Sequence, residues 1–505
     1  QPMSTSLMEI DLISEEARKQ GVTKINPKII ARLPGSSGGI EPVIKLLPGV
    51  SSNNELSSQY SVRGGNYDEN LIYVNGIQIY KPFLVRTGEQ EGLSFVNPNM
   101  IASLEFSSGG FQAKYGDKLS SVLDIKYKKP TSNNILLSTS MLGISLNAEG
   151  MINCNPKGRG ENHKLTYLIG GRIHATDFLL KSLDTQGDYR PLFKDFQTYL
   201  TYSNSKYPNW EFSLLNYYSQ NKYQMRPQTR ESRFGTISEP LQLTIYFEGQ
   251  EIDNYETHLA AISSTYSPNK LLKMQFTSSF FNTKEQQFYD ILGEYWLDEL
   301  NNSIGSNELG EIAFNRGIGA YMNHARNTLN ASVFNIYHDG RYKFNHKGGE
   351  IQWGGKYQFE NIEDQIREWE MVDSAGYSIS SINNNNLNLF EFKKGEASIE
   401  SNRISSYIQL SNNFEKKSHK IYVTFGSRIN YWNVNKELFI SPRGTISIKP
   451  NWTRDFMFNL SCGSYNQSPF FKEYRSQEGN LNTNISSQKS IHYVINSDYQ
   501  FKYAN

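Results

Sequence analysis

The chain has 505 residues, with 51 lysines and arginines against 50 aspartates and glutamates. The net charge of +1 supplies no basic field to attract phosphates, so it excludes a general nucleic-acid binder. No run of about 18 apolar residues occurs, which excludes a helical membrane protein but not a membrane β-barrel, because barrel strands are half polar. Two cysteines, Cys154 and Cys462, cannot form a disulfide framework.

Residues 1–130 mix short apolar runs with clusters of turn residues, and they predict a compact α+β domain. Asn75 and Gly76 stand between the β-forming runs 71–74 and 77–80, which is a strong hairpin signal because both residues tolerate positive φ. The other elements expected in this region are a short helix over 40–47 and strands over 101–106 and 122–127.

Residues 131–505 alternate apolar and polar residues over stretches that reach ten residues or more. Phe456 and Phe458, for example, alternate with Met457 and Asn459. Strands of soluble sandwiches usually run about 5–6 residues, whereas about 9–11 are needed to cross a bilayer at a tilt. The pattern therefore predicts an all-β transmembrane antiparallel β-barrel, surrounded by the lipid of the cell outer membrane, with Cys462 facing that lipid.

The lengths of the connections agree with a barrel. Residues 267–270 and 450–453 form tight turns, and short turns on one side with long loops on the other are typical of outer-membrane barrels. The long polar connections are expected at 225–250, 285–310 and 363–400.

About 13 strands are expected in this chain. An unclosed sheet edge in lipid leaves backbone groups unpaired at several kcal/mol each, so a barrel must close. Plugged outer-membrane transporters have about 22 strands. We therefore expect about 22 strands in the complete barrel, with the C-terminal strands missing from this chain. Completion of the sheet by another chain is the alternative.

Four short motifs follow one another in the first 130 residues. They are Leu-Leu-Pro-Gly-Val at 46–50, Ser-Val-Arg-Gly-Gly-Asn at 61–66, Asn-Pro-Asn-Met-Ile at 97–101 and Phe-Ser-Ser-Gly-Gly-Phe-Gln-Ala-Lys-Tyr-Gly at 106–116. In order and spacing they resemble the plug of TonB-dependent outer-membrane receptors, most of all those of the Bacteroidota. The resemblance implies that residues 1–130 are a plug domain inside the lumen and that 131–505 are the N-terminal portion of the barrel.

The same resemblance implies active import. In this family a substrate binds above the plug, and the energy-coupling protein TonB adds to a periplasmic segment as a β-strand and rearranges the plug. No TonB-binding box is visible before Met3, so coupling to TonB is implied by the resemblance alone. Nothing in the sequence selects among iron chelates, cobalamin, oligosaccharides and peptides as the imported substrate.

Other classes of function remain to be weighed. The chain could be a non-transporting subunit or scaffold of a larger outer-membrane complex for secretion or nutrient capture, with lipoprotein or other outer-membrane partners. A passive pore conflicts with a plug that fills the lumen. No enzyme is expected, since neither a G-x-S-x-G elbow nor a Ser/His/Asp arrangement stands out. No metal or other cofactor is expected, because the eight histidines lack zinc-site spacing.

Candidate site residues fall into two groups. The glycines of the plug motifs are expected to serve backbone conformations or close approaches that a Cβ would block. Arg63 is a candidate for an ion pair that seats the plug, although a weak surface pair is as strongly expected. The first group, with structural or gating roles, is Arg63, Gly64, Gly65, Asn75, Gly76, Gly109, Gly110, Tyr115 and Gly116. The second group faces the ligand from two polar plug loops, and it is Asn53, Asn54, Arg86, Glu89 and Gln90.

Two histidines, His174 and His492, occupy alternating positions that are expected to face the lumen. We interpret each of them as a hydrated side chain in the lumen.

Overall fold

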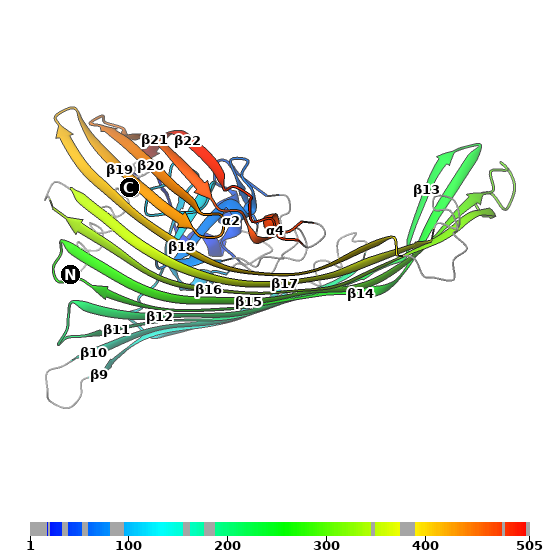
Figure 1. Cartoon of the computed structure of the whole chain (residues 1–505), viewed down its shortest axis with the longest axis horizontal. Helices are drawn as coiled ribbons and strands as arrows, with labels where there is room; N and C mark the ends of the chain where they lie inside the picture. Colours follow the sequence, from blue (N-terminus) through cyan, green and yellow to red (C-terminus); the bar gives the residue numbers. More distant parts are fainter. Residues whose placement is uncertain are drawn as a thin grey trace.

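The fold was taken from a computed structural model, which describes residues 18, 21–32, 39–52, 59–80, 95–154, 162–175, 187–344, 349–373, 389–476 and 480–500. Within these residues a small N-terminal unit packs against one large antiparallel sheet (Figure 1). The α+β unit and the all-β sheet of the sequence-based expectation are both confirmed.

The N-terminal unit is built on a five-stranded sheet in the order β1-β6-β7-β4-β5. Its strands are β1 (Thr23–Ile25), β4 (Asn70–Val74), β5 (Ile77–Ile79), β6 (Ile101–Ser107) and β7 (Ser121–Tyr127). A two-stranded ribbon, β2 (Val50–Ser51) with β3 (Ser61–Val62), and four short helices complete it: η1 (Pro27–Arg32), α2 (Glu41–Lys45), η2 (Tyr67–Glu69) and η3 (Pro98–Met100).

The predicted hairpin joins β4 to β5. Asn75 and Gly76 adopt φ values of 52° and 83°, the left-handed region that a two-residue hairpin turn requires. The Asn75 side chain also accepts a hydrogen bond from the backbone N–H of Tyr127 at 3.0 Å. The turn is therefore fixed to the neighbouring strand as well as by its own backbone.

The large sheet runs in chain order from β8 to β22, and every neighbouring pair is antiparallel. Strand β13 pairs only with β14, outside the main path. About 13 strands were expected, and the main path has one more. The strands are β8 (Asn134–Ser140), β9 (Gly143–Cys154), β10 (His163–Ala175), β11 (Gly187–Asn204), β12 (Trp210–Pro227), β13 (Arg230–Thr236), β14 (Glu239–Tyr266), β15 (Leu272–Leu300), β16 (Ile312–Lys343), β17 (Glu350–Asp373), β18 (Glu391–Lys416), β19 (His419–Trp432), β20 (Glu437–Pro450), β21 (Asp455–Gln467) and β22 (Gln488–Gln500).

Alternation along these strands separates two faces of the sheet. In β21, Leu460 and Cys462 are exposed on the convex face, whereas Met457, Asn459 and Ser461 are buried on the concave face. Large apolar side chains continue this exposed band across neighbouring strands. They include Phe276, Phe280, Ile336, Ile404, Ile408, Phe425, Ile429, Ile440, Ile446, Ile491, Tyr493 and Ile495. An exposed apolar band of this kind is what a lipid-facing barrel wall requires.

The two rims of the sheet differ. One, called here the short-turn rim, has the connections 205–209, 267–271, 417–418 and 451–454. The other, the long-loop rim, has the longer connections 301–311, 374–390 and 468–487 beside the short turn 433–436. Much of the expected loops 225–250 and 285–310 is instead strand, because β14, β15 and β16 reach 28, 29 and 32 residues. Both ends of the expected loop 363–400 are strand as well, since β17 continues to Asp373 and β18 begins at Glu391. Polar residues in water can pair in an antiparallel ladder, so their polarity did not indicate a loop. This extension projects from the long-loop rim (Figure 1).

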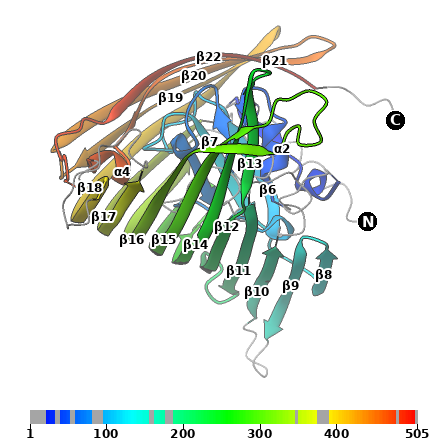
Figure 2. The ribbon, with the colours of Figure 1, turned by 90° about the vertical axis from the view of Figure 1, so that its right-hand side faces the viewer.

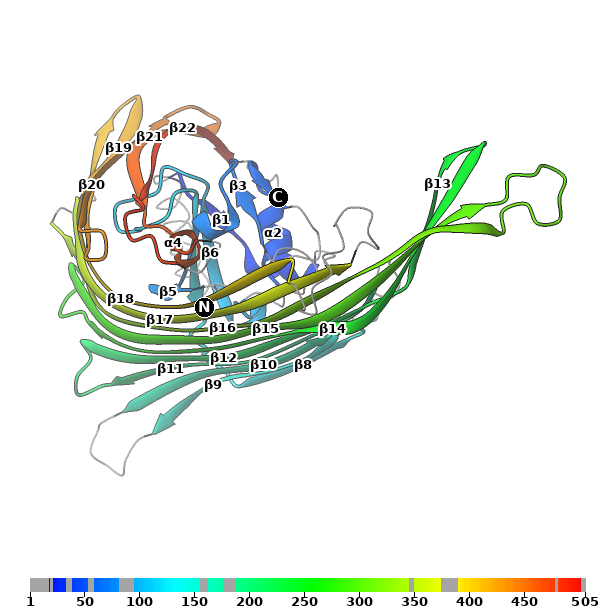
Figure 3. The same cartoon turned by 45° about the vertical axis from the view of Figure 1, so that its right-hand side comes forward.

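The N-terminal unit lies in the concave side of the curved sheet (Figures 2 and 3). One apolar cluster joins the two, with Ile72, Leu104 and Ile125 from the unit and Leu168, Leu215 and Phe281 from the wall. The described residues of the N-terminal unit therefore lie inside the wall, as the plug architecture requires. No helix in the described ranges is long and apolar enough to cross a membrane.

Candidate functional site

The contact surface between the N-terminal unit and the wall begins with a turn after β6. Gly109 and Gly110 adopt φ values of 121° and 67°, which L-residues rarely reach, and Ser107 Oγ donates to the Gly109 carbonyl at 3.0 Å. The Gly110 N–H donates to His492 Nδ1 of β22 at 3.2 Å. The two glycines thus direct the next residues against the wall, and His492 faces the lumen as predicted.

Strands β20 and β21 hold residues 111–115 through one arginine. Arg443 Nη1 donates to the carbonyl oxygens of Gln112 at 2.8 Å and Tyr115 at 2.5 Å. Its guanidinium lies 5.0 Å from the ring centroid of Phe111 and 4.2 Å from that of Tyr465. Tyr465 Oη donates to the Phe111 carbonyl at 2.9 Å. These contacts, called here the clasp, combine cation–π attraction with charge-assisted hydrogen bonds.

Asp117 follows the clasp and forms an ion pair with the wall. Its Oδ2 lies 3.3 Å from Arg428 Nη2, and its Oδ1 accepts from Asn430 Nδ2 at 2.9 Å. Burial alone would raise the pKa of the Asp117 carboxyl, but the charge and hydrogen bond of Arg428, with the charges of Lys356 and Arg403, together outweigh it, so this pKa is lowered. Arg428 Nη2 also donates to Ser405 Oγ at 2.8 Å. A Cβ at Gly116 would overlap the Arg428 guanidinium, so only glycine fits there.

Strands β10 to β15 make a different, dry contact. Arg172 and Asp195 form a buried ion pair in the wall, and Arg172 Nη1 donates to the Val96 carbonyl at 3.2 Å. Gln197 Nε2 donates to the Phe95 carbonyl at 2.5 Å. These polar groups are surrounded by apolar wall side chains that pack on the core of the unit. The latter are Leu168, Tyr199, Leu215, Tyr217, Leu259, Ala261 and Phe281.

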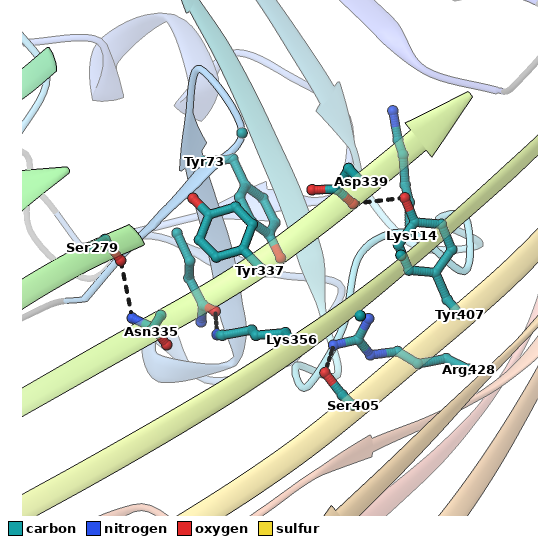
Figure 4. Close-up of a pocket in the computed structure, with 14 residues that line it drawn as sticks. Tyr73, Lys114, Ser279, Asn335, Tyr337, Asp339, Lys356, Ser405, Tyr407 and Arg428 are labelled. Atoms are coloured by element: carbon teal, nitrogen blue, oxygen red, sulfur yellow. Dashed lines mark hydrogen bonds between the residues drawn. The ribbon is translucent and has the colours of Figure 1, made fainter. Parts of the chain in front are cut away.

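Strands β16 to β19, called here the middle sector, meet the unit across two cavities. The inner cavity has a volume of about 50 Å³, and its lining includes Tyr73, Lys114, Asp339, Lys356 and Arg428 (Figure 4). Asp339 accepts a hydrogen bond from Tyr407 Oη at 2.8 Å. The cavity thus places three cationic side chains beside one hydrogen-bonded carboxylate.

The outer cavity has a volume of about 120 Å³ and lies nearer the long-loop rim. The connection between β21 and β22 covers part of it with helix α4 (Phe471–Tyr474), whose Tyr474 packs edge-on against Trp432 at 5.4 Å. Arg403 lies between the Trp432 ring, at 4.7 Å, and Glu360, at 3.2 Å. Aromatic rings beside convergent charged groups are typical of a small-molecule site, so this cavity is the best candidate for substrate contact.

Two hydrogen-bonded contacts separate the cavities. Lys356 Nζ donates to Gln78 Oε1 at 2.8 Å and to Tyr80 Oη at 3.2 Å. Gln78 lines both cavities, whereas Arg428 lines the inner one and Asp117 the outer one. The Asp117–Arg428 and Gln78–Lys356 contacts, called here the partition, therefore stand between the two spaces.

The residues selected from sequence are only partly brought together. Arg63 is exposed with φ of 50°, and among the described residues it makes no ion pair with the wall; Asp117 has that role instead. Gly64 has φ of 81° and open space around it, whereas a Cβ at Gly65 would lie 2.7 Å from Ser120 Oγ. Tyr115 donates through its hydroxyl to Asp124 at 2.8 Å.

Five of the selected residues cannot be placed. Asn53, Asn54, Arg86, Glu89 and Gln90 lie outside the described residues, so their ligand-facing role stays a prediction. His174 lines a separate cavity beside Asn97 and Arg172, on the lumen side as predicted.

The wall residues of the site were missed by sequence reasoning. Arg428, Asn430 and Arg443 occupy buried, concave-face positions of strands whose other face is apolar. For Arg428 and Arg443, the sequence signal was a cationic side chain at an inward-facing strand position. Their partners in the plug could not be named, because the sequence does not show how plug and wall are aligned.

Comparison with known proteins bears on the N-terminal unit directly. Residues 15–121 match the family model of the TonB-dependent Receptor Plug Domain. This region is a TonB-dependent receptor plug domain. The resemblance carried by the four sequence motifs is thereby confirmed, and the unit in the lumen is called the plug from here on.

Solved structures show the same fold over nearly the whole chain. The ferric citrate transporter FecA matches at 13% identity and a TM-score of 0.52, covering 95% of this chain and 67% of that one. The siderophore receptor PiuA from Acinetobacter baumannii matches at 11% and 0.53, covering 96% and 70%. The RagAB peptide importer matches at 10% and 0.55, covering 95% and 65%. The chain thus spans about two thirds of the length of these proteins. A comparison with curated proteins finds no match.

Proposed function

We propose that this protein is a receptor and transporter of the cell outer membrane that imports a substrate by TonB-coupled rearrangement of its plug. The observation that carries the proposal is a plug domain of this family seated inside an antiparallel wall with an exposed apolar face. On the same grounds we place the plug at residues 1–130 and the wall at 131–505.

The position of the plug N-terminus supports coupling at the periplasmic side. Short turns of outer-membrane barrels face the periplasm. Arg18 lies at the short-turn rim, where its Nη1 is 3.1 Å from Asp455 and its Nε is 2.5 Å from Asp498, at the ends of β21 and β22. The next element, β1, pairs with β6 over only three residues. Force on the chain before Arg18 would therefore act first on the ion pairs of Arg18 and then on the plug sheet.

Binding to TonB tests the proposal. The full-length protein is mixed with the C-terminal domain of TonB from the same organism, and the dissociation constant is measured with and without the segment that precedes Arg18. We expect binding that is lost when the segment is removed. Absence of binding by the intact protein would contradict energy coupling.

A second candidate function is a non-transporting subunit of a larger outer-membrane complex, with a lipoprotein or another outer-membrane protein as partner. It is favoured by the extension of β13 to β16 beyond the long-loop rim, which offers a surface outside the barrel wall (Figure 3). Co-purification of a stable partner from native membranes, together with failure to bind TonB, would support this function over import.

A further inference from the structure

Apart from the cavity beside Asn97, Arg172 and His174, the plug contacts the wall in three sectors of different chemistry. Strands β10 to β15, together with Val333 of β16, bury apolar side chains of plug and wall in one continuous cluster. Strands β20 and β21 hold residues 111–115 through the clasp, and His492 of β22 accepts a hydrogen bond from the Gly110 N–H. Between them, the middle sector contacts the plug mainly through polar side chains on either side of the two cavities.

We propose that the import route runs along the middle sector and that the partition is its barrier. The inference rests on the proposed function, because it assumes that the plug rearranges during import. The Asp117–Arg428 and Gln78–Lys356 contacts then break, and the outer and inner cavities join into one passage. The plug keeps its contact with β10 to β15 throughout.

The physical reason lies in what each sector exposes on separation. The contacts of the partition are polar or charged, and water can replace each hydrogen bond that they lose at small net cost. Separation of the β10 to β15 contact would expose apolar area to water, at a cost roughly proportional to that area. Arg172, which is paired with Asp195 in the wall, would also lose its hydrogen bond to the Val96 carbonyl. The plug therefore parts from the wall most readily at the middle sector.

The chemistry of the inner cavity also restricts what can pass. Lys114, Lys356 and Arg428 line it with Asp339 as the carboxylate, and Tyr407 donates to that carboxylate. This lining favours a polar solute with negative charge or hydrogen-bond acceptors. An apolar or cationic solute would leave these donors unsatisfied.

Cysteine accessibility tests the route. In a background with Cys154→Ser and Cys462→Ser, Ser405→Cys places a thiol in the inner cavity, and Ala261→Cys places a matched thiol in the dry sector. Both native side chains are almost fully buried, at 5% and 2% exposure. Intact cells are treated with 2-sulfonatoethyl methanethiosulfonate, a small anionic thiol reagent, with and without a protonophore. Asn335→Cys on β16, which also lines the inner cavity, serves if Ser405→Cys does not fold.

We expect energised cells to modify Ser405→Cys severalfold faster than uncoupled cells, while Ala261→Cys stays unreactive in both. Equal acceleration at both sites, or acceleration only at Ala261→Cys, would overturn the route and leave TonB-coupled import intact. No effect of energisation at either site would overturn the proposed function itself. A cationic reagent of the same size that reacts as well as the anionic one, relative to free cysteine, would overturn the charge preference.

Discussion

Asp117 of the plug and Arg428 of the wall meet at 3.3 Å although 311 residues separate them in the chain. The side chain of Arg428 is 8% exposed and that of Asp117 is 18% exposed, so water reaches the pair poorly. The contact fixes the plug against β19 and stands between the two cavities. We therefore expect the stability of the contact between plug and wall to depend on this pair.

Removal of the arginine tests that dependence. Arg428→Gln leaves Asp117 charged in a mostly buried place, which we expect to weaken plug seating by about 3 kcal/mol, the low end of the cost of breaking a buried pair. Hydrogen exchange of the amides of residues 110–120 in the full-length protein measures the change. The matched control is Arg63→Gln at the exposed plug arginine, with an expected effect within about 0.5 kcal/mol. Comparable effects of the two substitutions would refute the assignment.

Acid should act on the same pair in a defined direction. The pKa of Asp117 is lowered in the folded protein, since the charge and hydrogen bond of Arg428, with the charges of Lys356 and Arg403, together outweigh the effect of burial. Its stabilising effect is therefore complete above the ordinary aspartate pKa of about 3.9 and is lost only as the pH falls through the lowered value. We expect the difference in plug stability between the native protein and Asp117→Asn to stay constant from about pH 8 to pH 5 and to shrink below about pH 4. A difference that shrinks between pH 8 and pH 6 would show that another group is responsible.

Substitutions at two glycines distinguish the effect of close packing from the effect of backbone conformation. A Cβ at Gly116 meets the Arg428 guanidinium, so Gly116→Ala should displace it at a cost of about 2 kcal/mol in plug seating. Gly64 has open space around it but φ of 81°, so Gly64→Ala should cost about 1 kcal/mol through backbone strain alone. Exchange of the Ser120 and Ser121 amides in both variants gives the comparison. A larger effect at Gly64 than at Gly116 would contradict the close approach to Arg428.

The clasp can be tested by protease sensitivity. Arg443→Lys retains the charge but loses the planar group that lies between Phe111 and Tyr465, and a lysine is a poorer match for two carbonyls. We expect trypsin to cleave after Lys114 several times faster in this variant. Arg341→Lys is the control, because Arg341 is 42% exposed and lies 3.7 Å from Glu350 near the short-turn rim. Unchanged cleavage after Lys114 in Arg443→Lys would mean that the clasp does not hold this segment.

Local features of this fold could be predicted from the sequence because their causes are local. Asn75 and Gly76 specify their turn by the φ values they tolerate, and Leu460 and Cys462 specify their face by a period of two. The polar strands beyond the long-loop rim were taken for loops, since a water-exposed ladder has no apolar face to reveal it. The Asp117–Arg428 pair could not be found at all. Its geometry depends on how the plug is positioned inside the wall, and the pairing register of the wall strands does not determine that position.

The central claim is that the plug closes the lumen at rest. Conductance of the full-length protein in a planar lipid bilayer tests it most directly, with a variant that lacks residues 1–130 as the comparison. We predict no steady current from the intact protein and large, long-lived channels from the plugless variant. Large steady currents from the intact protein would contradict the account.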